Sequence, residues 1–169
     1  MGRTRDDNEP LTRQDTLLDT LEALMAIEAT ELKGALDQAA DLLVGALGAD
    51  KIDVSLHDPS IDTLVAMGIS DTPMGRRQQQ IGMDRLPVAN GGRVVQVYET
   101  GEPYLTGRAD EDPHVLLGFT HGLGIRSFLL VPLDINGERR GVVQAASSQV
   151  DAFTDEHRRF LEAVSRWVG

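Results

Sequence analysis

The dipeptide Asn136-Gly137 is the feature that most constrains how this chain can fold. It separates two apolar segments, RSFLLVPL at 126–133 and RRGVVQAASS at 139–148. An Asn-Gly pair between two such segments is the strongest short signal for a two-residue β-hairpin, so the segments are predicted to pair as antiparallel strands. The first segment is apolar on both faces, and we therefore expect it at the centre of a sheet.

A second hairpin is predicted nearer the N-terminus. The segment KIDVSLHD at 51–58 alternates between apolar and polar residues, which is typical of a half-buried strand with its polar side exposed. The turn signal DPS at 58–60 and the weaker strand IDTLVAM at 61–67 complete this hairpin. The next residues, 68–90, are rich in Gly, Pro and Gln and are expected to form an irregular surface loop.

Helical spacing of apolar residues marks both ends of the chain. Residues 15–31 and 35–47 each place leucines or alanines on one helix face. Thr154 is a good N-cap for a last helix, which carries acidic residues in its first turn. Between these ends, we expect a short helix at 93–99 and a short strand at 103–106.

These elements define the fold class. Because only antiparallel hairpins are available, the chain is predicted to be an α+β domain with one antiparallel sheet of five or six strands. The N- and C-terminal helices are expected to pack on one face of this sheet. Loops and short helices are left to cover the other face, where they are expected to form a pocket for a small molecule.

Composition excludes several classes of function. The chain of 169 residues has 27 acidic and 16 basic side chains, and this negative charge is unfavourable for binding nucleic acid or anionic membranes. It contains no cysteine, which excludes disulfides, thiolate catalysis and thiolate metal ligands. No apolar segment approaches the roughly 20 residues that a membrane span needs. A cytoplasmic protein is expected.

The segments above resemble a known family, the GAF domains, which are sensory modules of bacterial signalling proteins and relatives of the PAS domains. The resemblance covers roughly residues 33 to 168. Its most specific part is the combination of Arg-Ser before an apolar strand, a Gly-Val strand and then Phe-Thr-Asp-Glu. The matching segments are GADKIDVSLHD (48–58), GGRVVQVYETGEPYLT (91–106), EDPH (111–114), GIRSFLLVPL (124–133), GERRGVVQAAS (137–147) and AFTDEHRRFLEAVSRWV (152–168).

The resemblance implies a regulatory sensor domain in a signal-transduction protein, such as a two-component system. The expected division is a disordered leader at 1–11, a signalling and dimerisation helix at 12–32 and a sensory domain at 33–169. The resemblance further implies a homodimer and an output domain such as a histidine kinase, a phosphatase or a cyclase. A purely structural dimerisation module without a ligand stays open as an alternative. Family members that attach a bilin or reduce methionine sulfoxide use cysteine, so neither chemistry can operate here.

The candidate ligand-binding residues flank the expected pocket. Tyrosines there offer a flat apolar body with a polar tip, although Tyr104 is explained equally well by packing of the short helix. Arg126 and Ser127 suit an anionic group, but Arg126 is also expected to pair with a carboxylate such as Asp110 or Asp112. The candidates are Arg93, Tyr98, Tyr104, His114, Phe119, His121, Arg126 and Ser127.

Three interpretations of His121 stay open. It is a solvated loop residue, a polar group for an organic ligand, or the axial ligand of haem in a gas or redox sensor. No other metal site is expected, because His57 and His157 are predicted on the exposed faces of the first strand and the last helix, far apart. No catalytic constellation is recognisable, so a nonenzymatic protein is predicted.

The first helix is the second functional candidate. Its apolar stripe either folds back on the domain or pairs with its copy in a homodimer. We predict the homodimer, with an interface that includes Leu17, Leu21, Leu24 and Trp167.

Overall fold

The computed structural model describes residues 13–25 and 32–168, and every structural statement below concerns these residues. The expected leader at 1–11 and residues 26–31 of the expected first helix lie outside them. The helices and strands are α1 (Arg13–Met25), α2 (Leu32–Leu47), β1 (Lys51–Asp58), β2 (Thr63–Ile69), α3 (Pro73–Gln80), β3 (Arg85–Pro87), α4 (Gly92–Thr100), β4 (Tyr104–Thr106), β5 (Ser127–Ile135), β6 (Glu138–Ser147) and α5 (Asp155–Val168). Three short helical turns, η1 (Val88–Asn90), η2 (Ala109–Glu111) and η3 (Gly118–Gly122), lie in the connections.

The described strands form one six-stranded antiparallel sheet in the order β3-β2-β1-β6-β5-β4. Both predicted hairpins are confirmed. Asn136 and Gly137 turn the β5–β6 hairpin with φ of 53° and 78°, the positive values that a two-residue turn of this kind requires. The strand beginning at Ser127, β5, is an interior strand paired with β6 and β4, although β1 and β6 occupy the middle of the sheet. A strand is buried on both faces where helices or connections cover both sides of the sheet, and this is the case at β5 as well as at β1 and β6.

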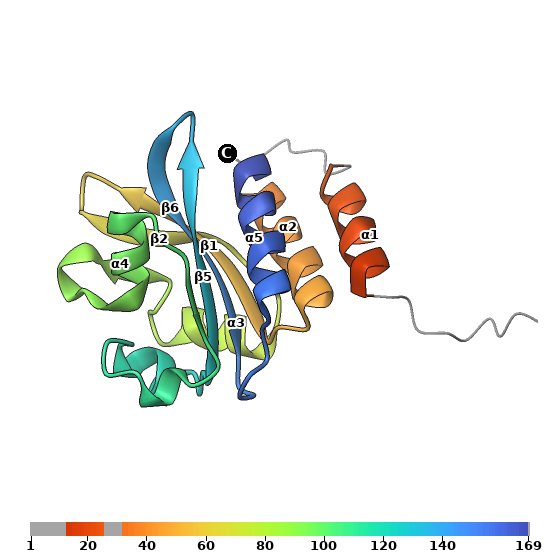
Figure 1. Cartoon of the computed structure of the whole chain (residues 1–169). Helices are drawn as coiled ribbons and strands as arrows, with labels where there is room; N and C mark the ends of the chain where they lie inside the picture. The colour runs from red at the N-terminus through yellow and green to blue at the C-terminus, as the bar shows by residue number, and fades with distance from the viewer. Residues whose placement is uncertain (1–12, 26–31, 169) are drawn as a thin grey trace, which may run out of the picture.

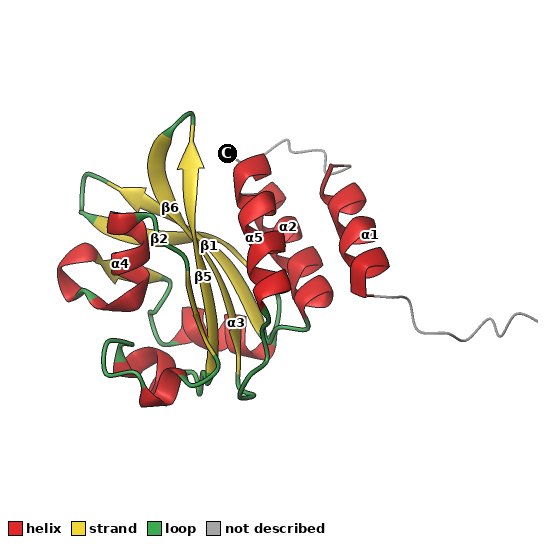
Figure 2. Ribbon diagram, viewed as in Figure 1, coloured by secondary structure: helices red, strands yellow, loops and turns green. Residues whose placement is uncertain are grey.

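The two faces of the sheet are covered differently (Figure 1). Helices α2 and α5 lie on one face, and α1 packs against α2 on the side away from the sheet. Helix α4, which packs on β5 and β6, and the short turns lie on the other face, with α3 near one end of β1 (Figure 2). This is the predicted α+β architecture, and it divides the interior into two cores.

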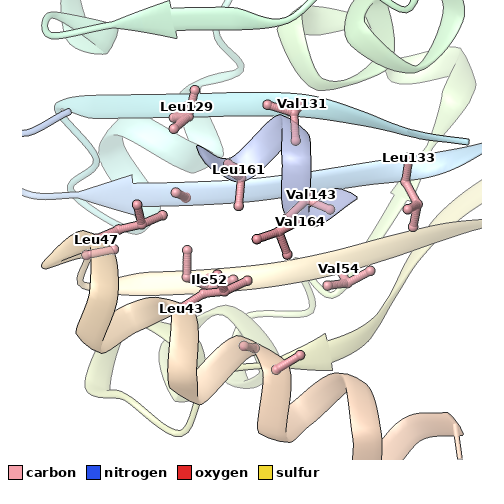
Figure 3. Packing of buried hydrophobic residues seen from close by; sticks show 14 of the residues in the cluster. Leu43, Leu47, Ile52, Val54, Leu129, Val131, Leu133, Val143, Leu161 and Val164 are labelled. Carbon is pink, nitrogen blue, oxygen red and sulfur yellow. The ribbon is translucent and has the colours of Figure 1, made fainter. Parts of the chain in front are cut away.

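The core under the terminal helices is built mainly from apolar side chains. Leu43 from α2 and Leu161 from α5 meet Ile52 of β1 and Leu129 of β5, and Figure 3 shows these side chains converging between the helices and the strands. Each is fully or almost fully buried, and burial of one such side chain contributes roughly 1.5–3 kcal/mol to stability.

The core on the other face combines strand residues with residues from the connections. Phe128 and Leu130 alternate with Leu129 along β5, so they point to the opposite face and meet Val94 of α4 and Phe119 of η3. The short helices and connections are therefore packed structure, with their own share of the interior.

Residues 68–90 differ from the sequence expectation, because they contain α3 and β3 instead of an irregular loop. The Thr72 hydroxyl accepts a hydrogen bond from the Gly75 amide at 3.2 Å and caps α3, with Pro73 in the first turn. Helix α3 is mostly polar and buries Gly75 and Gln78. It therefore lacks the apolar stripe on which helix prediction depends.

The cap of α5 is confirmed, but His157 is not on the exposed face. The His157 amide donates to the Thr154 hydroxyl at 3.3 Å, and the His157 Nδ1 accepts from the Thr154 amide at 3.0 Å. This reciprocal arrangement buries the imidazole against the edge of the Phe153 ring. His157 thus holds the start of α5.

Candidate functional site

The polar side of β1 is buried. Ile52 and Val54 point into the core under α2, so Lys51, Asp53 and Ser55 point to the other face of the sheet. The exposed fractions are 0% for Lys51 and Asp53 and 4% for Ser55. The expectation that this side of the strand is exposed is therefore wrong, because α3, η3 and their connections cover it.

These residues form one hydrogen-bonded group with two glutamines, here called the β1 polar cluster: Lys51, Asp53, Ser55, Gln78 and Gln144. The Lys51 Nζ lies 2.7 Å from the Asp53 Oδ2, and the Gln78 Nε2 donates to the same oxygen at 2.9 Å. The Ser55 hydroxyl donates to the Asp53 Oδ1 at 3.5 Å and accepts from the Gln144 Nε2 at 3.4 Å. Gln144 lies directly opposite Asp53 on β6.

Two acceptors of the cluster have no hydrogen-bond partner among the described residues. They are the side-chain oxygens of Gln78 and Gln144, which are 1% and 3% exposed as residues. A buried polar atom without a partner costs roughly 1–3 kcal/mol, and most such atoms in folded proteins are paired. The cluster therefore has unused capacity to accept hydrogen bonds.

An aromatic and apolar layer covers the cluster. The Phe119 ring lies 6.0 Å from the Lys51 Nζ and packs on Phe128 with 5.2 Å between ring centroids. The segment around Met83 lies directly against η3, since a Cβ added at Gly118 would come within 3.0 Å of the Met83 Cε. The segments 81–84 and 118–122 thus pack against each other and cover the cluster.

Two hollows flank this cover. One, of about 350 Å³, lies beside α3 and the end of η3. The other, of about 300 Å³, lies on the side of η3 that faces β3 and includes Phe119 in its wall. The first is lined by Asp50, Pro73, Met74, Arg77, Gly122, Leu123 and Ser148.

Arg93, Tyr104 and Asp112 form a second polar group at the edge of the domain. The Arg93 Nε lies 2.8 Å from the Asp112 Oδ2, and the Tyr104 hydroxyl donates to the same oxygen at 2.5 Å. The guanidinium also lies 5.0 Å from the centre of the Tyr104 ring. The His114 amide donates to the other carboxylate oxygen at 2.9 Å, so this group ties α4 and β4 to the segment after η2.

These contacts shift the pKa of both acids. Burial, followed by the hydrogen bond to Asp112, raises the pKa of Tyr104 to about 12. Burial acts to raise the pKa of Asp112, but hydrogen bonds from Arg93 and Tyr104 outweigh it and lower the pKa to about 2. Two of the predicted ligand contacts, Arg93 and Tyr104, therefore have structural partners.

Three further predicted contacts are also accounted for by packing. The Tyr98 ring stacks on His57 with 5.0 Å between centroids, and burial raises the pKa of Tyr98. Phe119 is buried in the core below α4. The Ser127 hydroxyl donates to the Gln149 carbonyl at 2.6 Å and accepts from the Ala152 amide at 3.0 Å, so it braces the connection before α5.

The remaining predicted contacts, His114, His121 and Arg126, are exposed. The expected pairing of Arg126 with Asp112 is wrong, because that carboxylate is held by Arg93. The structure therefore does not bring the eight predicted residues together around one cavity.

None of the five residues of the β1 polar cluster is among the residues predicted to bind a ligand. The signal was present, since the alternation at 51–58 separates Lys51, Asp53 and Ser55 from the residues that face the terminal helices. These three residues then lie on the face that was expected to hold a pocket. Gln78 and Gln144 carried no such signal.

The predicted dimer residues are distributed over two environments. Leu17 and Leu24 are buried within the chain and Leu21 is half-buried, where α1 packs on α2. Trp167 is 45% exposed near the end of α5, and Leu18 on α1 is 52% exposed.

Among the described residues, no three histidine, aspartate or glutamate side chains gather in a way that could hold a metal ion. None of the described helices combines the length and the apolar character needed to cross a membrane.

Known structures share this fold. The GAF domain of a phosphoenolpyruvate-protein phosphotransferase from Coxiella burnetii is 22% identical with a TM-score of 0.76, over 92% of this chain and 89% of that one. A free methionine-R-sulfoxide reductase from Neisseria meningitidis, solved with its substrate, is 20% identical with a TM-score of 0.73, over 99% of this chain and 93% of that one. At these identities the likeness establishes the fold alone. No curated protein sequence matches the chain.

The family itself follows from the sequence match. The model of the GAF domain matches residues 31–169, which is more than half of the chain. The match begins in the residues before α2 and includes every strand of the sheet and α5. This chain therefore belongs to the GAF domain family.

Proposed function

We propose that this GAF domain, a member of a family of regulatory and sensory modules, binds a small molecule on the sheet face away from α2 and α5. The observation that carries the proposal is the β1 polar cluster. A charged pair with no exposed surface, next to two unpaired amide oxygens, is a poor way to stabilise a core, because apolar residues of similar volume serve at least as well. A ligand that forms hydrogen bonds with these groups would explain why polar residues occupy this part of the core.

The proposed signal passes from the pocket to the terminal helices. Helix α3 carries Gln78 of the cluster, and the segment just before it is held by α2. The Asp37 carboxylate of α2 accepts from the Ile69 amide at 3.0 Å, and Asp41 accepts from the Asp71 amide at 2.7 Å. Movement of α3 on ligand binding would therefore move α2 as well.

We further propose that α1 and α5 pair between two copies of the chain and transmit this movement to an output domain such as a histidine kinase, a phosphatase or a cyclase. Leu18 and Trp167 are large apolar side chains that stay exposed on these helices, and this exposure supports the proposal. Leu17 and Leu24 then stabilise α1 within each protomer.

We propose a nonenzymatic role. Some structural neighbours are methionine sulfoxide reductases, including one from Neisseria meningitidis. Members of that type use cysteine for catalysis, and this chain has none. The alternative of a haem sensor receives no support from the position of His121, because its side chain is exposed on η3.

Thermal unfolding against a panel of cyclic nucleotides, nucleotides and small metabolites tests the sensory role. A ligand at about 100 times its Kd adds roughly 2.7 kcal/mol, which raises Tm by roughly 5–10 °C in a domain of this size. Light scattering on the same samples measures the dimer. A dimer that no compound stabilises would leave the structural dimerisation module as the function.

A further inference from the structure

The β1 polar cluster restricts the charge of a ligand. Lys51 and Asp53 form an ion pair of 2.7 Å, so their formal charges cancel within the cluster. Both side chains are fully buried. A ligand with a net charge would enter this site without a counter-charge, which is strongly unfavourable in a protein interior. The site therefore favours a molecule of zero net charge.

The two glutamines restrict the polar groups of a ligand. The Gln78 amide nitrogen already donates to the Asp53 Oδ2 and to the Met83 carbonyl at 3.1 Å, and the Gln144 amide nitrogen donates to Ser55. What both side chains still offer is a carbonyl oxygen, and each of these oxygens lacks a donor. A ligand that carries at least two N–H hydrogens can supply a donor to each of them.

Lys51 adds the complementary requirement. An ammonium group has three hydrogens, and among the described residues the hydrogen bond of this one is to the Asp53 Oδ2. Its other neighbour is the Phe119 ring, at 6.0 Å. The ammonium can therefore donate to an oxygen of a ligand while it keeps its pairing with Asp53.

We propose that the β1 polar cluster recognises a small molecule of zero net charge that combines an amino group with an oxygen acceptor. Its amino group donates to the free oxygens of Gln78 and Gln144, and its acceptor takes a hydrogen bond from Lys51. Free amino acids, as zwitterions, and nucleobases with an exocyclic amino group share this chemistry. The proposal rests on the sensory function proposed above and specifies the ligand of the same site.

The surroundings of the cluster are consistent with a ligand of this size. The hollow of about 350 Å³ includes Asp50, the residue before Lys51, and Met74 and Arg77, which lie on the same helix as Gln78. Met74 also packs against the apolar core over the cluster, and a methionine side chain rearranges easily. No member of the cluster lines this hollow, so a ligand that enters between α3 and η3 reaches the cluster only when Met74 moves aside.

The test is isothermal titration calorimetry of the whole chain against pairs of probes that differ by the amino group. The first arm compares each amino acid that has an uncharged side chain with its α-hydroxy acid, which lacks the ammonium group and is therefore an anion. The second arm compares cytosine with uracil, a pair that differs in the amino group at the same zero net charge. We expect binding in one arm only by the compounds that carry the amino group, and that arm identifies the source. Nucleoside monophosphates, which carry a net charge, are expected not to bind.

Two matched variants connect the binding to the cluster. Gln144→Met keeps the side-chain length but removes the free oxygen, and we expect it to weaken binding by about tenfold or more. The free protein loses an unpaired buried acceptor together with the long hydrogen bond of 3.4 Å from the Gln144 Nε2 to Ser55, so its Tm should not fall, whereas a purely structural role for Gln144 requires a lower Tm. Gln79→Met, on the exposed side of α3, is the control and should leave binding unchanged.

The outcomes separate the two proposals. Equal binding of the analogues without the amino group, full binding by Gln144→Met, or binding of a nucleotide alone would overturn this inference and leave the sensory function standing. If neither these probes nor any compound of the wider metabolite panel binds, both proposals are overturned. The free oxygens of Gln78 and Gln144 would then be explained as hydrogen-bonded to buried water.

Discussion

Replacement of Asp53 by asparagine should destabilise the domain strongly. The change keeps the shape of the side chain but leaves the Lys51 ammonium buried without a counter-charge. Removing one partner of a buried ion pair costs roughly 3–5 kcal/mol. This is a large part of the roughly 5–15 kcal/mol by which such domains are stable, and it corresponds to a fall in Tm of roughly 6–20 °C.

A matched control separates burial from the ion pair itself. Asp71 and Arg76 form an ion pair of 2.6 Å, almost the same as the 2.7 Å between Lys51 and Asp53, but both side chains are more than half exposed. Asp71→Asn should therefore cost about 1 kcal/mol or less. Urea unfolding of both variants, followed by circular dichroism, measures the two losses under identical conditions.

A double variant tests the physical reason for the loss. In Lys51→Met with Asp53→Asn, the uncompensated charge is gone, so most of the stability lost in the single Asp53 variant should return. If Asp53→Asn costs no more than Asp71→Asn, the pair is not buried in solution. If the double variant recovers nothing, the loss comes from the hydrogen bonds of Asp53 and not from the charge of Lys51.

Three further predictions concern other parts of the chain. The pKa of Asp112 is lowered from 3.8 to about 2 in the folded state, so ionised Asp112 contributes about 2 kcal/mol to the free energy of unfolding. This contribution is complete above pH 3.8 and is lost as the pH falls towards 2. Asp112→Asn should therefore remove this part of the pH dependence from urea unfolding curves. A Cβ at Gly75 would lie 2.2 Å from the Ser70 carbonyl oxygen, so Gly75→Ala should cost roughly 1–3 kcal/mol, whereas Gly45→Ala, in the exposed part of α2 with nothing within 4 Å, should add up to about 1 kcal/mol in the same unfolding assay. Trp167→Glu should lower the molar mass measured by light scattering towards that of the monomer. Because Trp167 is 45% exposed within the chain, the Tm of the monomer itself should not fall. An unchanged molar mass would exclude Trp167 from the interface.

Local signals in the sequence were sufficient for most of the architecture. The turn at Asn136-Gly137 and the N-cap at Thr154 depend on neighbouring residues, so they were predictable and are present. Helix α3 has the same kind of signal in Thr72-Pro73, but its surface is polar and the apolar periodicity that identifies helices is missing.

The candidate site was less predictable, because burial of a polar residue is decided by distant parts of the chain. Lys51 and Asp53 have the sequence pattern of an exposed strand face. They are buried because η3, almost 70 residues later, places Phe119 above them, and because α3 supplies Gln78. The burial of His157 has a different cause, which is local: the Thr154 amide three residues earlier donates to its Nδ1 and draws the ring inward. Single-sequence periodicity carries no information about such contacts.

The position of the cluster on β1 matters for how a bound ligand could be sensed. Successive residues of a strand point to opposite faces, so Ile52 lies between Lys51 and Asp53 and is buried against α2 and its neighbours. On the neighbouring strand β2, Gly68 lies opposite Val54 and packs closely against α2, because a Cβ added at Gly68 would lie 2.5 Å from the Leu36 Cβ. A close-packed contact of this kind cannot absorb a displacement of the strand, so α2 must follow it. A ligand that changes the geometry of Lys51 and Asp53 would thus act on the terminal helices through rigid packing, without a mobile linker between the two faces.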